Sequence, residues 1–155
     1  MGNYFYEDEK KEIIKVYFLE SNAREWARRF NKPKRPAEKF EKNPPLSSSQ
    51  LRKFHFEVKD LEERLENEIK TLSEKSKDEV NRNAVFVRIR PLVKMIKSKV
   101  AYVCRTPSSK DRKVPEEFKR YIDDMVDNIE DYKDFKAFAL SFEAVVGYFY
   151  GEGGR

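Results

Sequence analysis

The sequence predicts an all-α protein, a compact bundle of five to six helices with two long helices and a Pro-rich linker. Charged residues make up 39% of the chain, and the most frequent of them, Lys and Glu, favour helices. Apolar residues recur at intervals of three and four, the period of a helix face. The 155 residues, 14% of them aromatic, suffice for one hydrophobic core, so we expect a single domain over residues 1–155.

Two short helices and a linker are predicted in the first third of the chain. The first helix covers residues 6–20, where an acidic first turn precedes a broad apolar face. The second opens at Asn22, which forms a capping-box pattern with Glu25, and it ends before Pro33. The composition then changes to Lys, Pro, Glu and Asn over residues 32–45, which predicts a surface linker.

The first long helix opens at Ser47, which forms a second capping-box pattern with Gln50. It is expected to run for roughly 25 residues. Its apolar positions form a near-heptad stripe, typical of a helix packed against others. These positions are Leu51, Phe54, Val58, Leu61, Leu65, Ile69 and Leu72.

The second long helical segment is predicted from about Glu79 to Arg105, with Pro91 inside it. A proline in a helix interior costs about 3 kcal/mol or more, so we expect either a kink near residues 87–89 or two helices that abut at Pro91. The β-branched run at residues 85–89 is also compatible with a strand, but no partner strand is predicted elsewhere. The context therefore favours a helix.

Two further helices are predicted after a polar loop over residues 106–115. Pro115 suits the first position of a helix that ends near Asp131. The last helix runs to Tyr150, and apolar residues nearly encircle it, which predicts burial inside the fold or against a second copy. The glycine-rich residues 151–155 are expected to form a flexible tail.

The sequence offers no recognisable catalytic, cofactor or metal site. With one cysteine, Cys104, and one histidine, His55, neither an intramolecular disulfide nor a Cys/His metal cluster can form within the chain. We expect Cys104 in the core and His55 in a packed or interfacial position. Two acidic clusters are expected to be solvated helix faces, although the second has residues suited to Mg²⁺; they are Glu62, Glu63 and Glu66, and Asp123, Asp124 and Asp127. The chain is therefore predicted not to be an enzyme and to have no small-molecule substrate.

A membrane location is not predicted either. No segment approaches the roughly 20 apolar residues that span a bilayer, and the N-terminus lacks the basic and apolar regions of a signal peptide. Together with the single cysteine, this predicts a cytoplasmic protein.

Positive charge is concentrated in one part of the chain. Residues 82–120 contain 12 Lys or Arg against 3 Asp or Glu, whereas residues 121–155 contain 3 against 8. A polyanion is the natural partner of such a segment, because several cations can meet one phosphate backbone. The alternative is that these cations solvate one helix and pair with the acidic penultimate helix. The residues concerned are Arg88, Arg90, Lys94, Lys97, Lys99 and Arg105, with Lys110, Arg112 and Lys113 in the following loop.

Three stretches in order carry a family resemblance. They are LSSSQLRKF at residues 46–54, KVAYVCR at residues 99–105 and FEAVVGY at residues 142–148. Together they resemble the small helical subunit of type III-A CRISPR interference (Csm) complexes, over roughly residues 22–150. The segment at residues 4–20 lies outside the resemblance.

The resemblance implies a non-enzymatic, all-helical subunit that lies beside the CRISPR RNA (crRNA) backbone and contacts the target RNA paired with the guide. It implies contacts with other effector subunits and stacking on copies of itself. By motif position, the RNA-contacting role passes to Arg52, Lys53, Lys99 and Arg105. The charge argument alone adds Arg88, Arg90, Lys94 and Lys97, whereas Tyr102 is expected in the core.

A protein-interaction adaptor without nucleic acid is the alternative. In that case the apolar stripe over residues 51–72 and the aromatic C-terminal helix would form a dimer or grip a partner helix.

Overall fold

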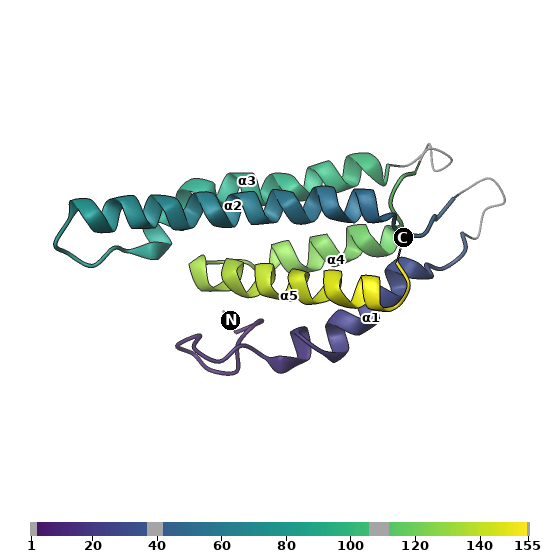
Figure 1. Ribbon diagram of the computed structural model, residues 1–155, viewed down its shortest axis with the longest axis horizontal. Helices are drawn as coiled ribbons and strands as arrows, with labels where there is room; N and C mark the ends of the chain where they lie inside the picture. Colours follow the sequence, from purple (N-terminus) through teal and green to yellow (C-terminus); the bar gives the residue numbers. More distant parts are fainter. Residues whose placement is uncertain (1–2, 37–41, 106–111, 155) are drawn as a thin grey trace.

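The computed structural model describes residues 3–36, 42–105 and 112–154 and is all-helical, as predicted. Its five α-helices lie in the predicted regions, preceded by one short 3₁₀-helix, and the described residues contain no β-strand (Figure 1). In chain order the elements are η1 (Val16–Phe18), α1 (Ser21–Asn31), α2 (Ser48–Lys75), α3 (Arg82–Val103), α4 (Glu116–Asp127) and α5 (Tyr132–Gly151).

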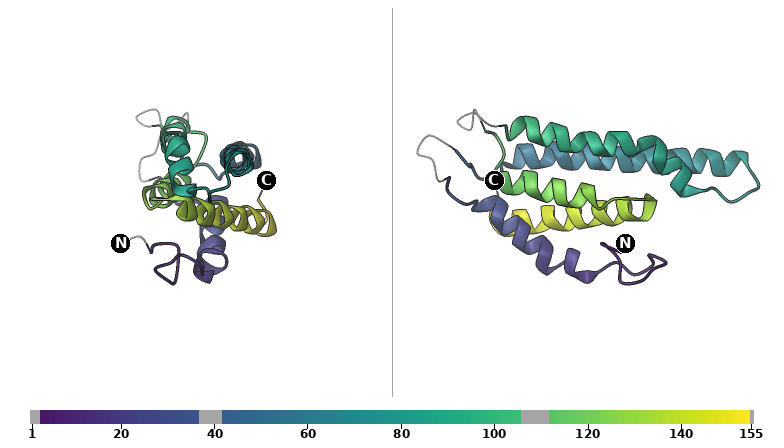
Figure 2. Two further views of the ribbon diagram at one scale, coloured as in Figure 1. Left: turned by 90° about the vertical axis from the view of Figure 1, so that its left-hand side faces the viewer. Right: turned by 180° about the vertical axis from the view of Figure 1, so that it is seen from behind.

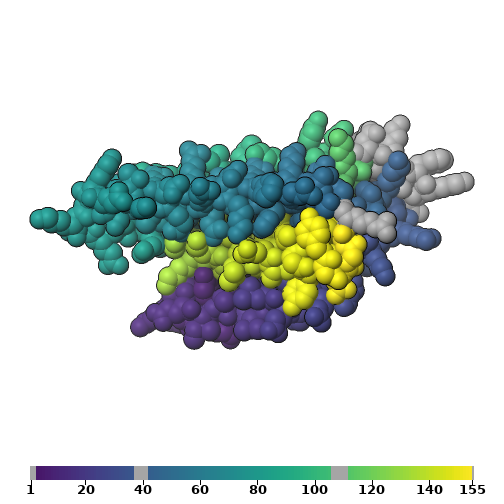
Figure 3. Space-filling view, viewed as in Figure 1, coloured from purple at the N-terminus to yellow at the C-terminus, as the bar shows by residue number. Residues whose placement is uncertain are grey.

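The helices are arranged in layers that place α5 in the middle. The long helices α2 and α3 lie side by side in one layer, α4 and α5 lie below them, and α1 with the N-terminal segment covers the other side of α5 (Figures 1 and 2). The connected ends of α2 and α3 extend beyond α4 and α5 (Figure 3). Because α5 contacts α1 on one side and α2 on the other, it is apolar nearly all round.

Aromatic side chains of α5 form the centre of the core. The ring of Phe142 is fully buried and lies 5.8 Å from Tyr121 and 6.3 Å from Phe118, centroid to centroid. Large buried rings of this kind compensate for the low apolar content of the chain. The predicted burial of this helix inside its own fold is confirmed; the fully buried phenylalanines of α5 are Phe135, Phe138, Phe142 and Phe149.

The predicted helix over residues 6–20 is wrong. Tyr6 and Ile14 instead form an isolated antiparallel bridge, and only η1 is helical in this segment. The Oδ1 atom of Asp8 accepts hydrogen bonds from the backbone N–H groups of Glu12 and Ile13, each at 2.9 Å. An aspartate that takes local backbone amides in this way competes with helix formation and favours a turn.

The helix starts were predicted with mixed success. Ser47 caps α2, because its Oγ accepts from the backbone N–H of Gln50 at 3.2 Å, as predicted. The cap predicted at Asn22 is wrong, since α1 already begins at Ser21 and the Asn22 amide donates to the hydroxyl of Tyr17 at 3.1 Å. Pro115 likewise precedes α4 as its N-cap and is not its first helical residue.

Helix α3 runs through Pro91 without a break. Of the two predicted alternatives, the pair of abutting helices is therefore wrong. The helix starts at a capped residue, since the side chain of Asn81 accepts from the backbone N–H of Ala84 at 3.2 Å.

The ends of the predicted linker are tied to α4. Asn43 donates to Glu117 Oε1 at 2.8 Å, and the backbone N–H of Lys34 donates to Glu117 Oε2 at 2.7 Å. Glu117 is buried, so these bonds satisfy a carboxylate whose burial would otherwise be costly.

Three predicted segments lie outside the described residues. They are linker residues 37–41, the loop residues 106–111 with Lys110, and Arg155 of the predicted tail. No described helix is both long and apolar enough to span a membrane.

Candidate nucleic-acid interface

The basic residues of α3 lie on two flanks of the helix. Arg88 and Lys99 face α2, where they form ion pairs with Glu68 and Glu57. On the other flank, toward α4, Lys97 pairs with Asp127. The predicted site residues of α3 therefore do not form one continuous patch.

Lys94 and Arg90 complete the flank that faces α4. Lys94 donates to the carbonyl oxygen of Val126 at 3.2 Å. Burial lowers the pKa of Lys94, and the nearby guanidinium of Arg90 lowers it further. The two cations therefore repel each other, a repulsion that a bound anion would relieve.

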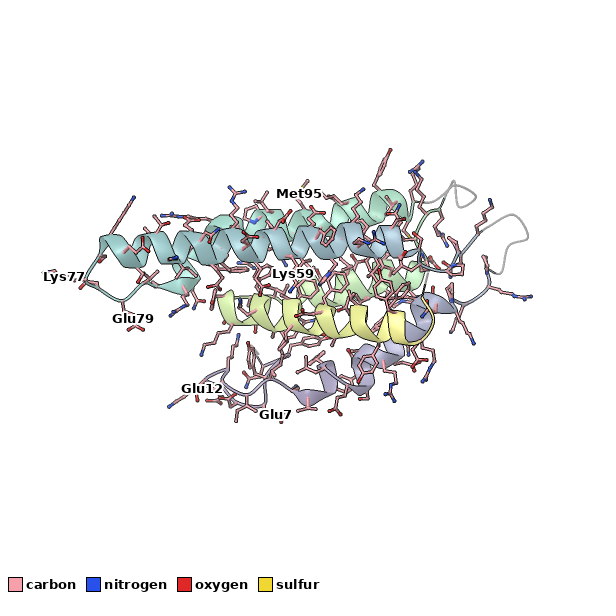
Figure 4. All side chains as sticks on the ribbon, viewed as in Figure 1. Glu7, Glu12, Lys59, Lys77, Glu79 and Met95 are labelled. Atoms are coloured by element: carbon pink, nitrogen blue, oxygen red, sulfur yellow. The ribbon has the colours of Figure 1, made fainter. Side chains whose placement is uncertain are left out.

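An apolar strip separates the two basic flanks. Val87, Met95 and Tyr102 are all more than one-third exposed, and their spacing of eight and seven residues puts them on one face. Met95 projects away from the other helices (Figure 4). The outward face of α3 is thus apolar in the middle and basic on both sides.

A groove forms where the start of α2 meets the end of α3. Its volume is about 610 Å³, and we call it the basic groove. It contains three lysines and one glutamate, a net charge of +2 at neutral pH. Its lining residues are Gln50, Lys53, Glu57, Ser98, Lys99, Tyr102, Val103 and Lys113.

Tyr102 does not lie in the core, which corrects the sequence-based expectation. Its side chain is 67% exposed. The guanidinium of Arg105 lies 4.8 Å from the centre of the Tyr102 ring and donates to the Tyr102 carbonyl oxygen at 3.1 Å. The position of Tyr102 was predictable, because it lies off the buried stripe formed by Ile96, Val100 and Val103.

The structure thus brings together some of the predicted residues and separates others. Lys53 and Lys99 share the basic groove, and Arg105 adjoins it through Tyr102. Arg52 is exposed one position from Lys53 but does not line the groove. The remaining predicted residues lie further along α3, namely Arg88, Arg90, Lys94 and Lys97.

Arg112 is a basic loop residue that serves the fold. Only 6% of it is exposed, and its Nη1 donates to Asn43 Oδ1 at 3.3 Å. The expectation that it meets a phosphate backbone together with its neighbours is therefore wrong. Lys113, the next residue, is exposed and lines the basic groove.

The acidic clusters are largely engaged in ion pairs. Lys136 bridges Glu62 and Glu66 at 2.8 and 3.2 Å, and Lys119 pairs with Asp123 at 2.7 Å. Within residues 3–36, 42–105 and 112–154, no three His, Cys, Asp or Glu side chains are placed to hold a metal ion.

His55 and Cys104 are both packed, as the sequence predicted. The ring of His55 lies 5.5 Å from that of Phe142 in an edge-on arrangement, and burial lowers its pKa. Burial also raises the pKa of the Cys104 thiol, which keeps it protonated and unreactive at neutral pH.

The chain matches a protein-family model over most of its length. The model described as Csm2 Type III-A matches residues 23–154, which leaves out only the N-terminal segment and the last residue. No curated protein and no solved structure gives a match. Since the match covers most of the chain, the protein belongs to the Csm2 family, the small subunits of type III-A CRISPR complexes.

Proposed function

We propose that this small subunit has no catalytic role and contacts the RNA of its complex through phosphate groups bound at the basic groove. One observation supports this more than any other. Lys53 comes from α2, Lys99 from α3 and Lys113 from the segment before α4, yet all three line the same groove. Cations from separate elements that converge on one groove are suited to a polyanion.

Phosphate contacts fit a subunit that must accept any guide and target. They fix position along the RNA and carry no sequence information, while base pairing between guide and target reads the sequence. Arg52 and Arg105 flank the groove and extend the positive surface. Of the α3 cations, Arg88 lies on the same flank as Lys99, roughly 16 Å further along the helix, whereas Arg90, Lys94 and Lys97 lie on the flank that faces α4 and would form a separate phosphate contact.

The groove lacks the arrangement that catalysis needs. The hydroxyl of Ser98 donates to the carbonyl oxygen of Met95 in its own helix at 2.9 Å, and Glu57 is paired with Lys99. Among the described residues, neither group has a partner that would activate it as a nucleophile or base. A positioning role for the subunit, with cleavage by other subunits, is consistent with this chemistry.

The protein-interaction adaptor is disfavoured, because the apolar residues expected to form its contact surface are buried. The α2 stripe from Leu51 to Ile69 and the phenylalanines of α5 are covered inside the bundle, so they are not free to grip a partner. For stacking of copies, we propose the exposed strip of α3 with Val87 and Met95. Replacing both by Asp should reduce the sedimentation coefficient if they hold copies together, and an unchanged value would reject this surface.

RNA binding at the groove is tested by charge reversal. In the test variant, Lys53, Lys99 and Lys113 are all replaced by Glu. In the matched control, Lys70, Lys75 and Lys77 are replaced by Glu; these exposed lysines lie toward the far end of the α2–α3 pair, where Lys77 is visible in Figure 4. Both variants undergo the same change in net charge.

The expected readout is fluorescence anisotropy of a labelled single-stranded RNA between 50 and 200 mM salt. Lys53 and Lys113 should each account for about 0.7 in the slope of log K against log salt, and Lys99, which is paired with Glu57, for less. The test variant should therefore lose about 1.4 to 2 in slope, and the control should retain most of it. Equal losses in both variants would show that net charge alone attracts RNA and would reject the groove.

A further inference from the structure

Tyr102 is the most exposed large hydrophobic side chain among the described residues, at 67%. It lies in the basic groove beside Lys99 and near Lys53. An exposed aromatic ring next to a cationic groove recurs in proteins that bind single-stranded nucleic acid, where bases stack on the ring and cations follow the backbone.

Arg105 holds the Tyr102 ring in place. Its guanidinium lies 4.8 Å from the ring centre, and its Nη1 donates to the Tyr102 carbonyl oxygen at 3.1 Å. This cation–π contact covers part of the ring and reduces its rotational freedom. A ring ordered before binding loses less entropy when a ligand stacks on it.

Gln50 adds a polar side chain to the lining of the groove. Its side-chain oxygen is buried and has no hydrogen-bond partner among the described residues, although the residue lines the groove. An unsatisfied acceptor of this kind is costly. A rotation of the Gln50 side chain that exposes this oxygen to the groove would let it accept from a ribose 2′-hydroxyl, a donor that DNA lacks.

We propose that the basic groove binds an unpaired ribonucleotide segment, with a base stacked on Tyr102 and phosphates held by Lys53 and Lys113. Lys99 contributes less, because it is already paired with Glu57. The groove, about 610 Å³, is within the range of roughly 300–1,000 Å³ that is usual for ligand pockets. This inference rests on the proposed function and specifies its ligand as unpaired RNA.

The inference differs from duplex binding in its geometry. Bases within an A-form duplex are stacked on their neighbours and paired, so their faces are not accessible to a side chain. A Tyr102 that stacks therefore requires a single-stranded or flipped-out nucleotide. The chain should accordingly prefer single-stranded RNA to the same RNA annealed to its complement.

The test compares four forms of the full chain, namely wild type, Tyr102→Leu, Tyr102→Phe and Tyr150→Leu. Leu removes the aromatic face, and Phe keeps it without the hydroxyl. Tyr150, exposed by 45% on α5 and absent from the groove lining, provides the matched control. Because both tyrosines are exposed, all four forms are expected to fold, which circular dichroism verifies.

The probes are a labelled RNA oligonucleotide, its duplex with complementary RNA, and single-stranded DNA of the same sequence. The wild type should bind the single-stranded RNA at least about tenfold more tightly than the duplex, and more tightly than the DNA. Tyr102→Leu should lose about tenfold in affinity for the single-stranded RNA, while Tyr102→Phe and Tyr150→Leu stay within about twofold of wild type.

Two outcomes separate this inference from the proposed function. If Tyr102→Leu binds like wild type while the triple Lys→Glu variant loses RNA, stacking is rejected and phosphate binding at the groove stands. Tighter binding of wild type to the duplex than to the single strand would also reject stacking. If wild type binds neither RNA at 50 mM salt, both the inference and the proposed function are wrong.

Discussion

Lys11 and Asp134 form an ion pair, 3.0 Å between Nζ and Oδ1, that joins the N-terminal segment to the first turn of α5. Their side chains are only 11% and 2% exposed. Lys11 also pairs with Asp131 at 2.7 Å, and the hydroxyl of Tyr6 donates to the carbonyl oxygen of Lys133 at 2.5 Å. The segment that lies outside the family match is therefore fixed to the central helix.

This attachment should weaken at alkaline pH. Burial, with a contribution from Asp134, raises the pKa of Tyr6 from 10.0 to about 12. Burial opposes protonation of Lys11, but hydrogen bonds to Asp131 and Asp134 outweigh it and raise its pKa overall. Both groups bind protons more tightly in the folded state, so their stabilisation is complete below pH 10 and is lost as pH rises toward 12.

The expected result is a melting temperature, measured by circular dichroism, that falls between about pH 10 and pH 12. A Tyr6→Phe variant loses one hydrogen bond, worth about 1 kcal/mol, so it should melt lower at pH 8. It should then lose less stability with rising pH, because one of the titrating groups is gone. Parallel pH profiles for the two proteins would contradict the role assigned to Tyr6.

The N-terminal segment also shows why its fold was mispredicted. The apolar spacing at Ile13, Ile14 and Val16 resembles a helix face, but Ile13 and Val16 are exposed. The buried residues are Tyr6 together with Phe5 and Phe18, and the rings of the two phenylalanines lie 5.4 Å apart. Their burial depends on contacts distant in sequence, which local periodicity does not contain.

The N-cap of α2 gives a direct test of the helix starts. Ser47→Ala removes the acceptor for the Gln50 backbone N–H and should lower the free energy of unfolding by about 1 kcal/mol. Urea denaturation monitors the change. Ser73→Ala, at an exposed position inside the same helix, is the control and should be neutral or slightly stabilising. A loss of equal size at both positions would mean that capping is not the cause.

Pro91 is expected to lower the free energy of unfolding, because it lies inside a helix. It is exposed inside α3 and leaves the Val87 carbonyl oxygen without the usual helical donor. Pro91→Ala should therefore raise the free energy of unfolding, by up to about 3 kcal/mol. Urea denaturation would measure it, and an unchanged or lower value would show that α3 needs the proline for its packing.

The candidate site was predictable only in part, because a groove requires the pairing of two helices. Motif position and charge indicated Lys53 and Lys99 separately, but the sequence does not specify that residues 50–57 of α2 lie beside residues 98–103 of α3. Arg112 is a residue that its charge indicated as a site residue but that the fold buries. Its charge suggested a solvent-exposed contact, yet its environment is set by Asn43, far away in sequence.

Glu57 opposes RNA binding in this arrangement, which yields the last prediction. It pairs with Lys99 inside the basic groove and reduces the groove charge by one. Glu57→Gln should free Lys99, strengthen binding of single-stranded RNA several-fold at 50 mM salt, and steepen the salt dependence by about 0.7 in log–log slope, one phosphate contact. Glu63→Gln is the matched control, since Glu63 is exposed on α2 outside the groove. Equal gains in both variants would indicate a general charge effect, and no gain at Glu57 would mean that Lys99 does not meet a phosphate.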